Sequence, residues 1–257
     1  VFNKYPHITY LGLYKNEEEK QNIKIVKKNG IKIAFVSFNQ YVNGVTYQEK
    51  LPYMINFHES TMMENMKKAR ENADIVIVSC HWGIEYDYYP NIFQKNMAKQ
   101  LADAGADVII GTHTHTLQDV EYIQRADGKR TLVAYSLGNF VSGMLEESCQ
   151  LEGMLSFDIE KKKIKNVVFT PLVNYYTLTG KRERHDFSVY RLKDYTNKLV
   201  EKHGFPNLTI SHMKEEALKR LKNSYLLQAI IKEEKIEVTE DSAKKEIAES
   251  ILKTYEL

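Results

Sequence analysis

Short apolar runs alternate with amphipathic segments in the first half of the chain. Residues 75–79 and 108–110 are largely apolar runs, which is typical of strands buried on both faces. Thr61-x-x-Glu64 is a capping box that opens a helix over residues 61–72. Residues 91–104 repeat their apolar positions with the period of a helix, which Gly105 ends. The order helix, strand, helix, strand predicts two parallel strands joined by a helical crossover, with both strand ends at one edge of a sheet.

The flanking regions carry different patterns. Residues 23–25 and 31–38 surround Asn29-Gly30, a dipeptide that supplies the positive φ angles of a tight hairpin turn. Alternating segments joined by charged turns predict antiparallel strands at residues 119–124, 131–135, 151–159 and 163–169. From Tyr190 onward the pattern predicts helices, at residues 193–203, 213–231 and, in a polar tail, 242–255. The chain therefore predicts an α/β fold, with a core over residues 1–180 and a mostly helical extension over residues 181–257.

Composition limits the class of protein. Apolar residues make up 43% of the 257 residues and charged residues 27%, which is enough apolar content for a packed core. Lys plus Arg number 36 against 34 Asp plus Glu, without a long basic block, so nucleic acid is not expected as a partner. Cys80 and Cys149 are too few for a disulfide framework and are expected to be free thiols. No run is long enough to span a membrane, and the start at Val1 leads us to expect that an upstream part has been removed.

Three histidines follow the two buried strands. His81 comes shortly after one apolar run, and His113 and His115 come two residues apart after the other. Ligands of open α/β sheets bind beside the carboxyl ends of parallel strands, and His-x-His spacing puts both rings on one side of an extended segment. A single histidine of this kind is more often bonded to backbone. Three converging imidazoles instead suit a divalent metal ion, which needs its ligands within about 2.0–2.2 Å, so we expect these residues to bind metal.

Four motifs carry a resemblance to a known family. They are Ser-Cys-His-Trp-Gly-Ile-Glu-Tyr at 79–86, Leu-Ala-Asp-Ala-Gly-Ala-Asp at 101–107, Gly-Thr-His-Thr-His-Thr-Leu-Gln at 111–118 and Tyr-Ser-Leu-Gly-Asn-Phe at 135–140. In order and spacing they closely resemble the CapA capsule-synthesis family, which is associated with poly-γ-glutamate capsules, over about residues 8–174. That family belongs to the calcineurin-like metallophosphatase superfamily. The resemblance therefore implies a metallophosphatase-like two-sheet sandwich flanked by helices, of which residues 1–180 are the C-terminal portion.

The resemblance also implies metal-binding roles. By match to the family's motifs, His81 and His113 bind one divalent ion and His115 binds its neighbour, the ions being Mn, Fe, Zn or Mg. A binuclear centre of this kind clamps a phosphoryl group between ions about 3.5–4 Å apart and lowers the pKa of a bridging water. The family's upstream aspartates, its Gly-Asp pair and its Asn-Asn-His segment do not occur in this sequence. The chain is therefore expected to carry half of a two-metal site, with the N-terminal part of the fold missing.

Three further residues are candidates for contacts with substrate. Glu85 either accepts a hydrogen bond from a ligating histidine or contacts substrate, and the alternative is a solvated loop acid. The segment from Ser136 to Asn139 offers an amide and backbone N–H groups to the pocket, although the same residues equally make an ordinary strand-to-turn signal.

Aromatic residues lie close to these motifs. Trp82, the only tryptophan, is more often a core residue than a platform on which substrate stacks. Tyr86, Tyr88 and Tyr89 precede Pro90 and form either an aromatic wall for a polymer or sugar or a half-buried loop, of which we slightly prefer the loop.

These features favour one function and leave alternatives open. The leading hypothesis is a CapA-type biosynthesis protein for a poly-γ-glutamate or polysaccharide capsule, with metal-dependent phosphoester hydrolysis at a metallophosphatase-like site. The alternative is a non-catalytic scaffold that handles or assembles polymer at the cell surface, and a metal-dependent amide hydrolase is a weaker one. Expected partners are the capsule polymer or its synthesis machinery, and the missing N-terminal segment or a second copy of the chain. The resemblance implies a location on the extracellular face of the membrane, through an N-terminal anchor outside this sequence.

Overall fold

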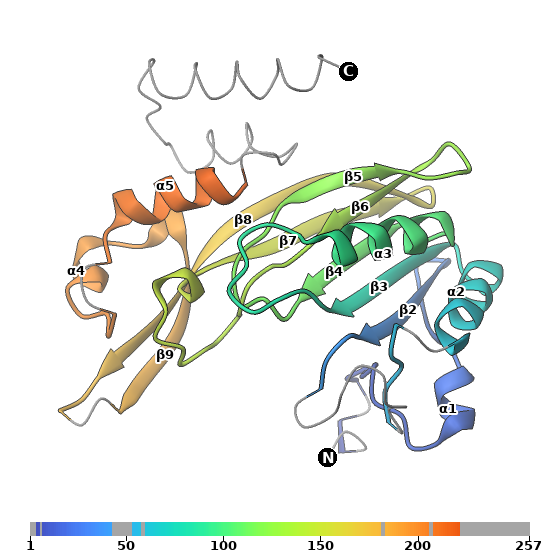
Figure 1. Cartoon of the computed structure of the whole chain (residues 1–257), viewed down its shortest axis with the longest axis horizontal. Coiled ribbons are helices and arrows are strands. Elements are labelled where there is room, and N and C mark those ends of the chain that lie inside the picture. The colour runs from blue at the N-terminus through green and yellow to red at the C-terminus, as the bar shows by residue number, and fades with distance from the viewer. Residues whose placement is uncertain are drawn as a thin grey trace.

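The computed structural model describes residues 4–5, 7–42, 53–57, 60–180, 183–205 and 208–221. Its elements form three layers, in which two helices cover one face of a six-stranded sheet and a three-stranded sheet covers the other (Figure 1). The predicted α/β fold, two packed sheets flanked by helices, is therefore confirmed. The part of the predicted helix beyond residue 221 and the polar tail lie outside the described residues.

The six-stranded sheet runs in the order β1-β2-β3-β4-β6-β5. Its strands are β1 (Lys24–Lys28), β2 (Ile31–Asn39), β3 (Ile75–His81), β4 (Val108–Thr112), β5 (Val120–Gln124) and β6 (Arg130–Ala134). β1 and β2 form the predicted antiparallel hairpin, and Asn29 and Gly30 at its turn have φ angles of 50° and 78°. β2, β3, β4 and β6 are parallel, so their carboxyl ends meet at one rim of the sheet.

The described helices that cover this sheet pack on one of its faces. The short helix α1 (Glu17–Gln21) precedes β1, and α2 (Ser60–Asn72) and α3 (Ile92–Asp103) cover the sheet face. Side chains of the buried strands pack into both neighbouring layers. Val78 belongs to the core under the helices, whereas Val108 belongs to the core beside the second sheet. This double burial explains why β3 and β4 are nearly continuous apolar runs rather than alternating ones.

The second sheet is antiparallel, in the order β7-β8-β9. The alternating pattern predicts β7 (Leu151–Glu160) and the first half of β8 (Lys163–Leu178), but it does not predict β9 (Arg184–Arg191). β9 is an edge strand with mostly exposed or half-buried side chains, so few of its positions need to be apolar. The sheet therefore continues past residue 180, into the segment expected to be a helical extension.

The rest of the described extension is helical but broken. A 3₁₀ turn at Leu192–Asp194 and the short helix α4 (Asn197–Val200) stand where one helix over residues 193–203 is predicted. The break falls at Tyr195, whose extended backbone accompanies burial of its ring in the core of the second sheet. The helix α5 (Ile210–Arg220) then packs on that core. Among the described helices, none combines the length and the apolar character needed to cross a membrane.

Candidate metal centre

Two parallel strands deliver histidines to the same rim of the six-stranded sheet. β3 ends at His81, which lies opposite Thr112 at the end of β4. β4 passes close to β6 at Gly111, where a Cβ atom would lie 1.9 Å from the carbonyl oxygen of Tyr135. Only glycine fits there, so the sequence Gly-Thr-His lets the strand pack fully and places His113 on the turn directly after it.

The three histidines predicted from the sequence lie together at this rim. The ring centroids of His81 and His113 are 4.4 Å apart, and those of His113 and His115 are 6.2 Å apart. His113 and His115 have φ angles of 101° and 61°, a region that residues other than glycine seldom adopt. Backbone strain of this kind costs about 1–3 kcal/mol per residue and is concentrated at functional sites. Their convergence is confirmed, and their role as metal ligands stays a prediction.

His81 and His113 form the tighter pair, and both rings favour the neutral state. Burial, followed by the charge on the neighbouring His81, lowers the pKa of His113 to about 4. Burial also lowers the pKa of His81, against the opposing effect of a hydrogen bond with the Tyr41 backbone. Nδ1 of His81 is buried and has no hydrogen-bond partner among the described residues. Histidine binds a metal ion as the neutral imidazole, through a ring nitrogen that is free to donate its lone pair, so the pair is suited to this role.

His115 is oriented by a neighbouring amide. Its Nδ1–H donates to Oδ1 of Asn139 over 2.8 Å, which leaves the lone pair of the neutral ring on Nε2. Nε2 lies 3.9 Å from a carboxylate oxygen of Glu85, and the Tyr86 ring centroid is 6.2 Å from that of His115. The structure therefore brings two of the predicted substrate-binding residues, Glu85 and Asn139, to the two ring nitrogens of one histidine.

The set of possible metal ligands is incomplete. Within the described ranges, no three His, Cys, Asp or Glu side chains are arranged as ligands of one metal ion. Imidazole suits zinc, iron and other transition metals, and a structural or catalytic zinc ion takes at least three protein ligands. His81 and His113 therefore fit two positions around one ion, and further ligands must come from elsewhere.

The remaining sequence candidates divide into core and surface positions. Ser136 is fully buried, and its Oγ accepts a hydrogen bond from Gly138 N at 3.2 Å, so it shapes the turn that presents Asn139. Trp82 is fully buried in the core between the helices and the sheet, which confirms its predicted core role. Three neighbouring tyrosines keep two-fifths or more of their surface exposed, at 40%, 40% and 43%: Tyr86, Tyr88 and Tyr89.

Two side chains that the sequence motifs do not include also reach the rim. Tyr41 lies just beyond β2, and its ring centroid is 5.3 Å from that of His113. Gln40 Oε1 accepts a hydrogen bond from Gly83 N, which ties the end of β2 to the loop after His81. These two residues could be predicted from the sequence in the same way as the histidines, because β2 is parallel to β3 and ends at the same rim.

Fold and site together define a class of protein, an α/β two-sheet sandwich with a histidine cluster at the rim of its parallel strands. Residues 3–144, more than half of the chain, match the family described as bacterial capsule synthesis protein PGA_cap. The chain belongs to this family. A shorter match, over residues 208–256, is to the C-terminus of the bacterial trigger factor protein.

Two curated relatives carry names connected with capsule biosynthesis. The chain is 34% identical over 139 residues to the capsule biosynthesis protein CapA of Bacillus anthracis, a match that covers 52% of this chain and 33% of the relative. It is 31% identical over 160 residues to the PGA biosynthesis protein CapA of Bacillus subtilis, covering 62% of this chain and 41% of the relative. The matched part of the chain thus spans 33% to 41% of the length of these relatives.

Solved structures resemble the fold more distantly. A putative 5′-nucleotidase from Staphylococcus aureus matches over 70% of this chain and 36% of its own, with 14% identity and a TM-score of 0.42. An NAD nucleotidase from Haemophilus influenzae matches over 87% of this chain and 44% of its own, with 14% identity and a TM-score of 0.41. At these scores the likeness carries no argument about the site or the function.

Proposed function

We propose that the protein acts in bacterial capsule biosynthesis through a metallophosphatase-like metal site whose chemistry, in the whole protein, is phosphoester hydrolysis. The observation that supports this most is the His81–His113 pair, whose ring centroids are 4.4 Å apart. Nδ1 of His81 is buried and has no hydrogen-bond partner in the part of the chain that the structure describes. The pair lies at the rim where α/β sheets bind their ligands. The names of the two CapA relatives support the role in capsule or poly-γ-glutamate biosynthesis.

His81 and His113 would hold one divalent ion, which is Mn, Fe, Zn or Mg, and His115 would face a second ion. A divalent ion in such a site polarises a phosphoryl oxygen and lowers the pKa of a bound water. The residues of this chain prepare the site before any ion is bound. Burial lowers the pKa of His81 and of His113, which favours the unprotonated rings that a metal ion needs, and Asn139 orients His115 as the tautomer with its lone pair on Nε2.

The partner we propose is the capsule polymer or its synthesis machinery, on the extracellular side of a membrane anchor. Tyr86, which is 40% exposed next to Glu85, offers a ring face beside His115. Phe140, which is 67% exposed, directly follows Asn139 in the sequence. Exposed aromatic residues near a polar site suit the binding of an extended polymer. The location follows from the family resemblance and is part of the same proposal.

A non-catalytic polymer-handling scaffold is the second candidate, and the incomplete ligand set of the described residues favours it. Hydrolysis of bis-p-nitrophenyl phosphate by the full-length protein with Mn²⁺ distinguishes the two. The enzyme hypothesis predicts a rate that EDTA abolishes and that His113→Ala reduces to background. His185→Ala, a change at a half-exposed histidine on β9, is the control and should leave the rate unchanged. Polymer binding without any EDTA-sensitive rate would contradict the enzyme and support the scaffold.

A further inference from the structure

The helix α5 packs against the second sheet (Figure 1). An apolar stripe and one buried arginine hold it there. Met213, Ala217 and Leu221 are at most 2% exposed and belong to the core of the second sheet. Arg220 is only 3% exposed, which is rare for arginine unless its charge is paired. Its charge partner is Glu216, whose Oε2 accepts hydrogen bonds from Nε at 3.1 Å and from Nη2 at 3.0 Å.

Arg220 also contacts two loops that come from different parts of the chain. Nη1 donates to the carbonyl oxygen of Ser148 over 2.8 Å, and the guanidinium carbon lies 4.6 Å from the ring centroid of Tyr88. Ser148 belongs to the loop between β6 and β7, whereas Tyr88 belongs to the loop between β3 and α3. Nε2 of His212 on α5 lies 2.8 Å from a carboxylate oxygen of Glu147, which adds a second polar link to the first of these loops.

The loop that carries Tyr88 leads directly to His115. Three hydrogen bonds tie this loop to the turn that bears the histidine. They are Thr116 Oγ1 to Asp87 O at 2.5 Å, Gln118 Nε2 to Asp87 O at 3.0 Å, and Tyr86 N to Thr114 O at 2.8 Å. The same loop presents the Glu85 carboxylate to Nε2 of His115. A shift of Tyr88 would therefore change the contacts on the Nε2 side of the His115 ring.

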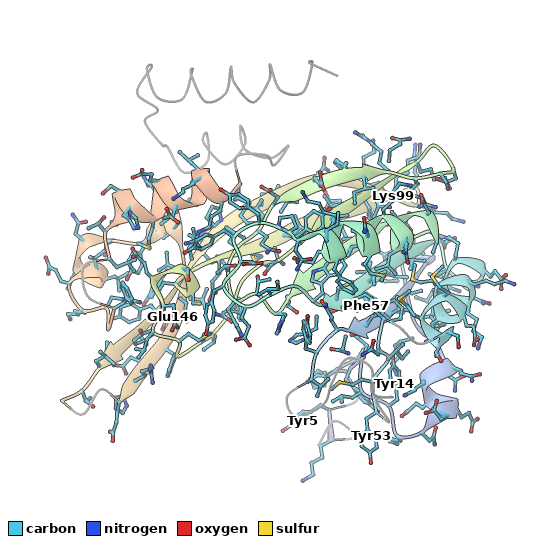
Figure 2. All side chains as sticks on the ribbon, in the orientation of Figure 1. Tyr5, Tyr14, Tyr53, Phe57, Lys99 and Glu146 are labelled. Carbon is cyan, nitrogen blue, oxygen red and sulfur yellow. The ribbon has the colours of Figure 1, made fainter. Side chains whose placement is uncertain are left out.

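The loop between β6 and β7 leads to the other side of the same ring, and Figure 2 shows Glu146 on it. Gln150 Nε2 donates to the carbonyl oxygens of Met144 and Glu146, at 2.9 Å and 3.0 Å. Met144 Sδ accepts a hydrogen bond from Asn139 Nδ2 at 3.7 Å, and Asn139 Oδ1 accepts the one from His115 Nδ1. A shift of this loop would therefore change the hydrogen bond on the Nδ1 side of the His115 ring.

We propose that Arg220 is a positioning residue for His115, so that the docking of α5 sets the orientation and tautomer of this ring. The two loops thus connect Arg220 with His115 through two separate series of contacts. One guanidinium contacts both loops, and its removal loosens both at that end, although the His212–Glu147 contact still links α5 to one of them. The consequence for metal binding rests on the proposed function, whereas the positioning of the ring does not.

Long-range ¹H–¹⁵N spectra of the histidine rings in the metal-free protein at about pH 8 test this role, because they report which ring nitrogen carries the proton. Wild-type His115 is expected to be the Nδ1–H tautomer. Arg220→Met keeps a long side chain but removes the donors, and His115 is expected to become a mixture of tautomers, as in Asn139→Ala. Lys219→Met is the matched control, because Lys219 also pairs with Glu216, at 3.4 Å, but is 63% exposed.

Two further variants separate positioning from general loss of structure. Tyr88→Leu breaks only one of the two links and should change the His115 signal less than Arg220→Met does. Arg220→Lys keeps one donor for Ser148 and should recover part of the wild-type signal. A wild-type His115 signal in folded Arg220→Met and Tyr88→Leu would overturn the proposal. Equal changes at His81 would also overturn it, since they would show a loss of structure rather than positioning.

Mn²⁺ binding by the same variants distinguishes this inference from the proposed function. Arg220→Met is expected to lower the affinity for Mn²⁺ about tenfold, the size typical of losing support for a metal-ligating histidine. In one outcome, neither the wild type nor any variant binds Mn²⁺ while the tautomer of His115 still changes in Arg220→Met. This result would contradict the proposed function and support the role of Arg220. Tight Mn²⁺ binding together with an unchanged His115 tautomer in Arg220→Met would contradict the role of Arg220 and leave the proposed function intact.

Discussion

Glu152 on β7 should make the stability of this protein fall as pH rises. The residue is fully buried, and neither carboxylate oxygen has a hydrogen-bond partner among the described residues. Burial raises the pKa of Glu152 from its ordinary value of 4.5 to about 9. The folded protein therefore keeps a proton on this carboxyl group over a pH range in which the unfolded chain has lost it.

The sign and the size of the effect follow from proton linkage. Between 4.5 and about 9 the folded state binds one more proton than the unfolded state, so each pH unit lowers the free energy of unfolding by about 1.4 kcal/mol. At neutral pH the accumulated loss is about 3 kcal/mol, against a total stability of about 5–15 kcal/mol for a typical domain. Glu152→Gln keeps the shape of the side chain and cannot ionise. We expect this variant to lose the slope and to be more stable than the wild type by about 3 kcal/mol at neutral pH.

Urea unfolding followed by the fluorescence of Trp82, the single tryptophan and a buried one, measures this difference between about pH 5 and pH 8. Glu160→Gln, a change at an exposed position of the same strand, is the control and should keep the slope of the wild type. Parallel stability curves for the wild type and Glu152→Gln would refute the reasoning. They would mean that Glu152 has the same protonation state in the folded and the unfolded protein.

The remaining predictions concern the rim of the sheet. Gly111→Ala should lower the free energy of unfolding by about 1–3 kcal/mol, because its Cβ would lie 1.9 Å from the Tyr135 carbonyl oxygen. Thermal unfolding measures this change, and Gly180→Ala is the control, because a Cβ at Gly180 would meet no atom of the described residues within 4 Å beyond its chain neighbours. Asn139→Ala should weaken Mn²⁺ binding about tenfold in calorimetry, and an unchanged affinity would show that its hydrogen bond does not orient a ligand. The described residues include no three side chains arranged as ligands of one metal ion, so this chain alone should hydrolyse bis-p-nitrophenyl phosphate no faster than Mn²⁺ does, and an EDTA-sensitive rate that His113→Ala abolishes would contradict this.

The rim of the sheet could be predicted because its causes are local in the sequence. β3 and β4 are buried on both faces, so each is an apolar run, and the histidines follow within a few residues. β9 escapes prediction because it is an edge strand whose exposed positions need no apolar pattern. The predicted helix over residues 193–203 fails at Tyr195, because burial of that ring in the second core outweighs the local helical pattern.

Two features of the structure depend on residues that lie far apart along the chain. Arg220 reaches the loops beside His115 only because α5 folds back onto the second sheet, and no local pattern indicates that contact. Glu152 occupies a strand position whose neighbours on the same face, such as Met154, are exposed. It is buried where the turn at Gly138 packs over β7, since a Cβ on that glycine would lie 3.6 Å from the Cβ of Glu152. Sequence patterns alone do not reveal such packing.

Binding of Mn²⁺ or Zn²⁺ to this chain, measured by calorimetry, tests whether the histidines at the rim of the sheet hold a metal ion. The account predicts binding that EDTA reverses, with an affinity at least about tenfold lower in His81→Gln and in His113→Gln. His185→Gln, at a histidine that is 48% exposed on β9, should bind as the wild type does. Absence of binding in the wild type, or equal binding in the wild type and the His81→Gln/His113→Gln double variant, would contradict the assignment of this rim as a metal site.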